Sequence, residues 1–160
     1  MQFTQSMSYP GTVDEVVAMY LTPDYLERRF GRFVVEGSTT VSVEGERVSY
    51  AGTVRPELIP AAATRFVKSD LRVTFTEEWT LNEAEATSRT SVTVDGAPVS
   101  VEATSTLTPS DAGSAREVSG NLSVRVPLLG GRIEKEAVAR VGRLTENEQA
   151  SATQWLEEHR

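Results

Sequence analysis

The chain has 160 residues, of which 39% are hydrophobic and 24% are charged, a composition typical of one folded domain. Its formal net charge is −7 and its basic residues are dispersed, so binding to nucleic acid, which depends on neutralising phosphates, is not expected. The absence of cysteine excludes disulfides, thiolate nucleophiles and cysteine-ligated zinc.

The start of the chain shows no targeting signal. Residues 1–6 have neither the cationic region nor the continuous apolar stretch of a secretory signal. No run of apolar residues approaches the roughly 18 that are needed to span a membrane. We therefore expect a single domain over residues 1–160, located in the cytoplasm and without a transmembrane segment.

The N-terminal part predicts one strand and two short helices. Apolar and polar residues alternate over residues 2–7, which indicates a strand with one covered face. Thr12 followed by Glu15 has the spacing of a capping box and predicts the start of the first helix. Thr22 is the predicted N-cap of the second helix, with Pro23 in its first turn and Gly31 at its end.

The middle of the chain predicts an antiparallel sheet. Apolar and polar residues alternate in six segments, residues 33–35 with 41–43, 48–54, 71–81, 86–94, 99–107 and 118–126. Gly37 marks a bulge or bend in the first segment, and Asp95–Gly96 marks a hairpin turn. The proline-containing residues 56–70 predict a connection over the sheet, and entry to a cavity is expected either beside this connection or beside the helix at residues 22–31.

The C-terminal part predicts one long amphipathic helix. After Gly130–Gly131, apolar residues recur at helical spacing at Ile133, Ala137, Val141 and Leu144. Gly142 weakens this helix and Thr145 can cap a new one, so a break between them and a continuous helix are both open. Gly130–Gly131 is better explained as a turn into the helix than as a phosphate-binding loop, because no lysine follows at the required spacing.

This order of elements resembles the START-like, helix-grip superfamily, which includes polyketide cyclases and Bet v 1-like plant proteins. Four segments more narrowly resemble its uncharacterised actinobacterial branch DUF2505: Tyr9–Pro10, Glu78–Trp79, Val126–Glu134 and Trp155–Leu156. The resemblance implies an α+β helix-grip fold, with a curved antiparallel sheet of six or seven strands packed on a long C-terminal helix and two short helices after the first strand. It also implies a cavity for a lipid, sterol, polyketide or other apolar molecule, and it supplies no catalytic residue.

The predicted function is binding of a hydrophobic small molecule between the sheet and the C-terminal helix, with no cofactor and no metal ion. Small residues on the inner face are expected to leave room for the ligand, among them Gly52, Thr90, Ala103, Ser105 and Gly120. A close-packed core is the alternative. The expected ligand-binding residues are Leu26, Phe30, Tyr50, Phe66, Phe75, Glu77, Trp79, Arg89, Leu122, Ile133, Ala137 and Val141.

Glu77 is the residue that breaks the apolar side of the strand at residues 71–81. Its carboxylate is exposed or paired with an arginine, contacts a ligand, or acts as an acid–base group with a pKa raised by burial. The last case would suit a cyclase/aromatase-like or hydrolase-like enzyme that also uses Tyr50 or Arg89. A regulatory protein-interaction module is a further alternative. The single histidine, His159, lies next to the end of the chain and is a poor catalyst candidate.

Overall fold

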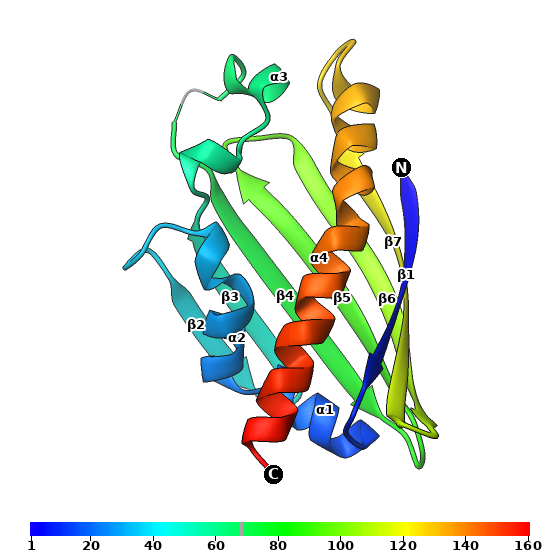
Figure 1. The fold of residues 1–160 in the computed structure, drawn as a ribbon. Coiled ribbons are helices and arrows are strands. Elements are labelled where there is room, and N and C mark those ends of the chain that lie inside the picture. The colour runs from blue at the N-terminus through cyan, green and yellow to red at the C-terminus, as the bar shows by residue number, and fades with distance from the viewer. Residues whose placement is uncertain (68) are drawn as a thin grey trace.

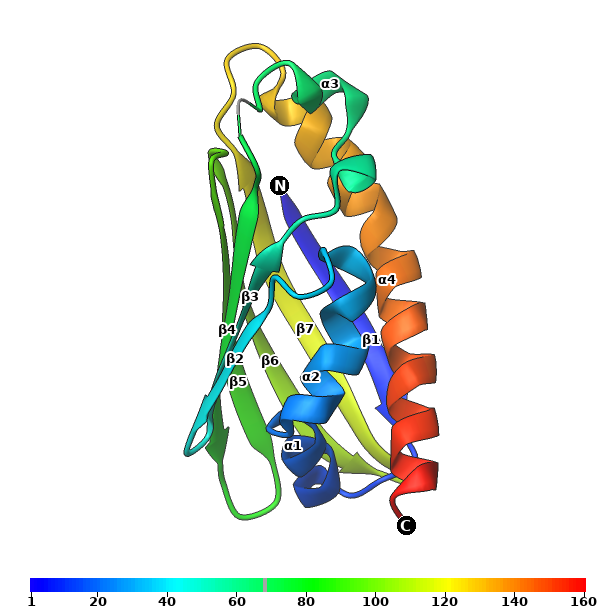
Figure 2. The ribbon, with the colours of Figure 1, turned by 90° about the vertical axis from the view of Figure 1, so that its left-hand side faces the viewer.

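The computed structural model of this protein describes residues 1–67 and 69–160. It shows one curved antiparallel sheet of seven strands, with a long helix lying across its concave face and two short helices at one side (Figures 1 and 2). This arrangement confirms the predicted α+β helix-grip fold. The predicted connection at residues 56–70 includes Lys68, which lies outside the described residues.

The sheet has the strand order β1-β7-β6-β5-β4-β3-β2. Its strands are β1 (Gln2–Tyr9), β2 (Thr40–Glu44), β3 (Arg47–Thr53), β4 (Arg72–Leu81), β5 (Ala86–Asp95), β6 (Val99–Ser110) and β7 (Gly113–Val124). The helices are α1 (Val13–Tyr20), α2 (Pro23–Phe30), α3 (Ala61–Thr64) and α4 (Gly130–Glu158), with 3-10 turns at Gly31–Phe33 and Pro56–Leu58.

The two N-terminal helices start in different ways. The backbone N–H of Glu15 donates to Thr12 Oγ1 at 3.2 Å, and the Thr12 N–H donates to Glu15 Oε1 at 3.4 Å, so the predicted capping box is confirmed. Thr22 precedes α2 as expected, but its hydroxyl donates to the Ala18 carbonyl at 2.7 Å and does not cap the helix. The Thr22 hydroxyl therefore binds a carbonyl near the end of α1, and not a backbone N–H at the start of α2 as predicted.

The first predicted strand after the helices is shorter than expected. Residues 33–35 form no strand, and Val34 makes only an isolated bridge to Val54. Regular pairing begins at Thr40, after Gly37 has turned the chain with a φ of 81°. The side chain of Val34 instead folds over the inner face of β3, where it is buried.

The predicted alternation of inner and outer residues is confirmed along β4 and its neighbours. Glu77 lies opposite Val48 on β3 and Thr90 on β5, while the other parity, which includes Arg89, faces outward. The expectation that small inner residues leave empty space is wrong for two glycines. A Cβ at Gly52 would meet Val34 Cγ1 at 2.9 Å, and a Cβ at Gly120 would collide with the ring of Phe3.

Helix α4 is continuous through Gly142 and Thr145 (Figure 1), so of the two open alternatives the structure has the unbroken one. It starts after a turn in which Leu128 has a φ of 67° and the Gly130 N–H donates to the Val126 carbonyl at 2.8 Å. A Cβ at Gly130 would collide with the carbonyl oxygen of Val124, so only glycine fits where the helix leaves the sheet.

The buried side chains form two clusters on the inner face of the sheet. One joins the C-terminal end of α4 to α1 and includes Tyr9, Tyr20, Trp79 and Trp155. The other lies under α2 and consists of Leu26, Val34, Val48, Tyr50 and Phe75. Near the other end of the sheet, where α4 begins, the inner residues Val92, Val101 and Leu122 are only half-buried.

Candidate functional site

An apolar cavity lies at the end of the molecule where α4 begins. Its volume is about 240 Å³. Its walls are the connection between β3 and β4, the ends of the central strands and the first turns of α4. The lining residues are Val54, Leu58, Ile59, Pro60, Ala63, Phe66, Val67, Leu71, Val94, Ala97, Pro98, Val99, Leu122, Val124, Val126, Ile133 and Ala137.

Every side chain that lines this cavity is apolar, so contact with a ligand would replace water with hydrocarbon surface on all sides. Leu58 and Phe66 line it and are each 42% exposed, which shows that the cavity reaches the surface beneath the connection. Figure 2 shows this connection with α3 standing over the space between the sheet and α4. The cavity thus opens where the sequence predicts a cover.

The structure divides the twelve predicted binding residues among five places. Those that line the cavity are Phe66, Leu122, Ile133 and Ala137. Those that pack with or against the cluster under α2 are Leu26, Phe30, Tyr50 and Phe75. The ring centroids of Phe30 and Phe75 lie 4.7 Å apart. Val141 is half-buried and does not line the cavity. Glu77 and Trp79 belong to a buried polar network, and Arg89 lies on the outer face.

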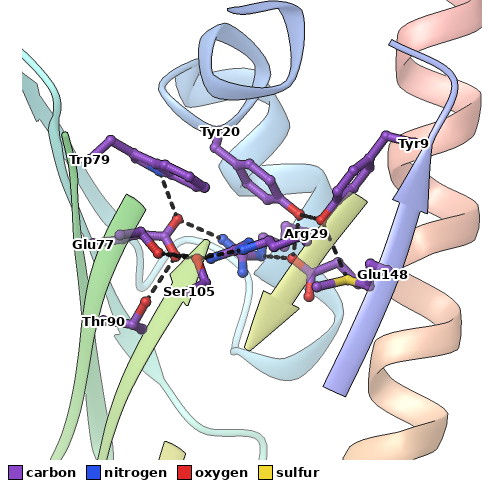
Figure 3. A network of polar contacts seen from close by, with 11 residues as sticks. Tyr9, Tyr20, Arg29, Glu77, Trp79, Thr90, Ser105 and Glu148 are labelled. Atoms are coloured by element: carbon purple, nitrogen blue, oxygen red, sulfur yellow. Dashed lines mark hydrogen bonds and ion pairs between the residues drawn. The ribbon is translucent and has the colours of Figure 1, made fainter. Parts of the chain in front are cut away.

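The polar network is centred on the Glu77 carboxylate (Figure 3). Arg116 Nη2 on β7 donates to Glu77 Oε2 at 2.8 Å, and both side chains are buried, with 3% and 1% of their surface exposed. The Thr90 hydroxyl donates to the same oxygen at 2.9 Å, and the Trp79 indole N–H donates to Glu77 Oε1 at 3.2 Å. Of the three expected roles of Glu77, the arginine pairing is therefore confirmed.

Arg116 makes two further hydrogen bonds within the sheet. Its Nε donates to Ser105 Oγ at 2.9 Å, and its Nη2 donates to Ser88 Oγ at 3.1 Å. The guanidinium carbon lies 4.8 Å from the Trp79 ring centroid and 4.9 Å from that of Tyr20. Ser105, which was expected to leave room for a ligand, instead accepts a hydrogen bond from this buried cation.

A second ion pair connects the helices to this network. Arg29 Nε on α2 lies 2.6 Å from Glu148 Oε1 on α4, and Arg29 Nη1 lies 3.7 Å from Glu77 Oε1. The Tyr20 hydroxyl donates to Glu148 Oε1 at 3.3 Å and shares a hydrogen bond of 2.7 Å with the Tyr9 hydroxyl. The network therefore joins the sheet to α1, α2 and α4 (Figure 3).

The electrostatics of Glu77 are the reverse of those expected for an acid–base catalyst. Burial raises the pKa of its carboxyl, but the Arg116 and Arg29 guanidinium groups and the hydrogen bonds outweigh burial, so the pKa lies below its ordinary value of 4.5. The expectation of a raised pKa is wrong because it considered burial without the two arginines. Glu77 is a fixed anion at neutral pH.

The polar residues of the enzyme alternative do not converge on one site. The Tyr50 hydroxyl donates to Glu27 Oε2 at 3.2 Å, and burial together with that carboxylate raises the pKa of Tyr50 to about 12. Arg89 is exposed and lies opposite Glu78 in the register of β4 and β5, on the outer face, so its predicted contact with an inner ligand is wrong. Within the described residues, no three histidine, aspartate or glutamate side chains are grouped to hold a metal ion.

The sequence analysis missed Arg29, Arg116 and Glu148. Two of them carry a signal in the sequence. Arg116 precedes Val118 by two residues and so shares its inward parity, and Arg29 follows Leu26 by three residues and so lies near it on α2. An inward glutamate with two inward arginines elsewhere in the chain is the pattern that indicates a buried ion pair. The pairing of Arg29 with Glu148 depends on how two distant helices meet and has no such signal.

In the described part of the chain, none of the helices combines the length and apolar character that crossing a membrane requires.

Comparison with known proteins shows that the chain belongs to one family. A family model described as "Protein of unknown function (DUF2505)" matches residues 4–156. The uncharacterized protein Rv0481c of Mycobacterium tuberculosis is 28% identical over 166 residues, which cover 96% of this chain and 95% of that protein. The expected resemblance is therefore confirmed.

Solved structures share the fold at low sequence identity. TTHA0849 from Thermus thermophilus matches with a TM-score of 0.64 and 15% identity over 99% of both chains. Norcoclaurine synthase from Thalictrum flavum matches with a TM-score of 0.61 and 12% identity over 99% of this chain and 87% of that one. Ara h 8.0201 matches with a TM-score of 0.57 and 9% identity over 99% of this chain and 98% of that one.

Proposed function

Because the chain belongs to the DUF2505 family and has the helix-grip fold, we propose that it binds a hydrophobic small molecule, of the lipid, sterol or polyketide type, in the apolar cavity at the start of α4. The observation that carries the proposal is a cavity of about 240 Å³ with only apolar side chains in its walls. Concave apolar pockets of this kind are the usual form of small-molecule sites.

The cavity lies apart from the polar network. On the sheet, the lining residues Val94, Val99 and Val124 lie four residues along their strands from the row of Glu77, Thr90 and Ala103, and Leu122 lies two residues from it. At about 3.3 Å per residue, these separations are roughly 13 Å and 7 Å. A ligand in the cavity therefore contacts apolar side chains, while the charged groups of the polar network lie outside the cavity and hold the elements of the fold together.

The size of the cavity limits the part of the ligand that it encloses. A volume of about 240 Å³ holds roughly eight groups of the size of a water molecule, at about 30 Å³ each. Burial of apolar ligand surface contributes about 25 cal/mol per Å² to binding. A larger ligand would extend past Leu58 and Phe66 to the surface, or would require the connection between β3 and β4 to move outward.

A substitution that fills the cavity tests this proposal. Ala137→Phe places an aromatic ring among the lining residues, whereas Ala139→Phe makes the same change at an exposed position of α4 and serves as the matched control. The protein is purified from its own host, analysed by native mass spectrometry for a bound molecule, and titrated with a lipid extract. The unchanged protein and Ala139→Phe should carry or bind the same hydrophobic molecule, and Ala137→Phe should lose it.

Two results would overturn the proposal. One is that no hydrophobic molecule from the extract binds the unchanged protein. The other is that Ala137→Phe, folded as shown by its thermal unfolding, binds the same molecule as tightly as Ala139→Phe does.

A further inference from the structure

A second pocket, of about 200 Å³, opens between the C-terminal end of α2 and the middle of α4. It is lined by residues 28–30 and 32–33 on one side and by Leu144, Asn147, Glu148 and Ser151 on the other. We call it the α2–α4 pocket. None of its residues lines the apolar cavity, so it is a separate site.

The charges around the α2–α4 pocket leave one cation without a partner. Arg28 pairs with Glu158, with both of its terminal nitrogens 3.1 Å from Oε2, and Arg29 pairs with Glu148 at 2.6 Å. Arg32 is exposed, and its guanidinium carbon lies 4.7 Å from the Phe33 ring centroid. Over residues 1–67 and 69–160, no carboxylate forms an ion pair with Arg32. The pocket therefore has a net excess of one positive charge in a protein whose net charge is −7.

Arg29, which lines the pocket, also has a buried donor without a hydrogen-bond acceptor. Arg29 Nη1 is buried and has no hydrogen-bond partner within the described residues, and it lies 3.7 Å from Glu77 Oε1, too far for a good hydrogen bond. Leaving a charged donor unpaired in a protein interior is costly, so such groups are normally satisfied by water or by a ligand. Figure 3 shows Arg29 between the Glu77 and Glu148 carboxylates.

The rest of the wall combines apolar surface with neutral polar groups. Phe30, Phe33 and Leu144 provide the apolar surface, and Asn147 and Ser151 provide hydrogen-bonding groups. Guanidinium groups bind planar carboxylates with two parallel hydrogen bonds, and the aromatic rings provide flat surfaces for an apolar body. The geometry points to a binding site for a small monocarboxylate with an aromatic or otherwise apolar body, whose carboxylate accepts from Arg32 and Arg29.

Benzoate is the probe, and benzamide is its neutral counterpart of nearly the same shape. The full-length protein, labelled with ¹⁵N, is titrated with each compound while the side-chain signals of Arg29 Nε–H, Arg32 Nε–H and the Asn147 amide are followed by NMR. Benzoate should shift these signals and bind about tenfold more tightly than benzamide, because only benzoate offers a charged acceptor.

Arg32→Gln should weaken benzoate binding about fivefold, a loss at the upper end for an exposed ion pair. Arg140→Gln, which removes the same charge from an exposed position of α4 outside the pocket, should leave it unchanged. Ala137→Phe, which fills the apolar cavity, should also leave benzoate binding unchanged. The test of the α2–α4 pocket is therefore independent of the test of the proposed function. Arg29 itself is not substituted, because its removal would disturb the buried network.

The assignment is overturned if benzamide binds as tightly as benzoate, if the benzoate shifts map outside the α2–α4 pocket, or if Arg32→Gln and Arg140→Gln bind benzoate alike. Inorganic phosphate is titrated in parallel. Tighter binding of phosphate than of benzoate at the same signals would overturn the choice of a carboxylate with an apolar body.

Discussion

Arg116 on β7 and Glu77 on β4 form an ion pair of 2.8 Å across the inner face of the sheet, although two strands lie between them. Long side chains make this contact possible. The intervening strands present the small residues Thr90 and Ala103 at the level of Glu77, and Ser88 and Ser105 at the next level toward Arg116. The small and hydroxyl residues that were expected to make room for a ligand thus make room for a salt bridge.

Glu77→Gln should destabilise the protein by about 3–5 kcal/mol, because it leaves the Arg116 cation buried without its counterion. Urea unfolding at pH 7 measures the change. The matched control is Glu78→Gln, the next residue along β4, whose exposed side chain lies 3.9 Å from Arg47 and should contribute about 0–1 kcal/mol. Equal effects of the two substitutions would show that the buried pair contributes no more than a surface pair.

The stability of the protein should fall in acid partly through Glu77. Its pKa in the folded state is lowered from 4.5, so the ionised carboxylate stabilises the fold above that ordinary value, and this contribution is lost progressively as the pH falls toward the folded-state pKa. The difference in unfolding free energy between the unchanged protein and Glu77→Gln should be constant from pH 7 to about pH 5 and should shrink below about pH 4.5. A difference that stays constant down to pH 3 would contradict the lowered pKa.

Thr12→Ala should cost about 1 kcal/mol of stability, because it removes the acceptor for the Glu15 N–H at the start of α1. Thr22→Ala is the matched control at the other N-cap position. Its hydroxyl donates to the Ala18 carbonyl and caps no helix, so its removal should cost less. Thermal unfolding of both variants makes the comparison, and a larger loss for Thr22→Ala would contradict the assignment of the caps.

Gly142→Ala should stabilise the protein by up to about 1 kcal/mol, because Gly142 lies inside α4 and a Cβ there would meet nothing within 4 Å. Gly120→Ala should destabilise it by about 1–3 kcal/mol, because its Cβ would collide with the Phe3 ring. Denaturant unfolding measures both. Adding Phe3→Leu to Gly120→Ala should recover part of the loss, and a lack of recovery would show that the collision is not its cause.

The sequence alone determined most of the fold. Alternation of apolar and polar residues has a period of two along a strand, so the inner parity of β3 to β7 can be read without a structure, including the inward position of Glu77. The capping box of α1 is a local feature and was correctly predicted. The turn predicted at Gly130–Gly131 lies instead at residues 127–129, and both glycines are the first residues of α4. Residues 33–35 were wrongly predicted as a strand, because their apolar character reflects the packing of Val34 over Gly52.

Only the tertiary structure decided what the inner face contains. Whether Gly120 leaves a hole depends on Phe3, which is distant in the chain but adjacent in the sheet, and whether Glu77 is a catalyst or a fixed anion depends on Arg116 and Arg29. Periodicity gives the direction of a side chain, but it does not give its partner on another element. For that reason the sequence indicated a cavity beneath the C-terminal helix, while its position at the start of α4 followed from the assembled fold.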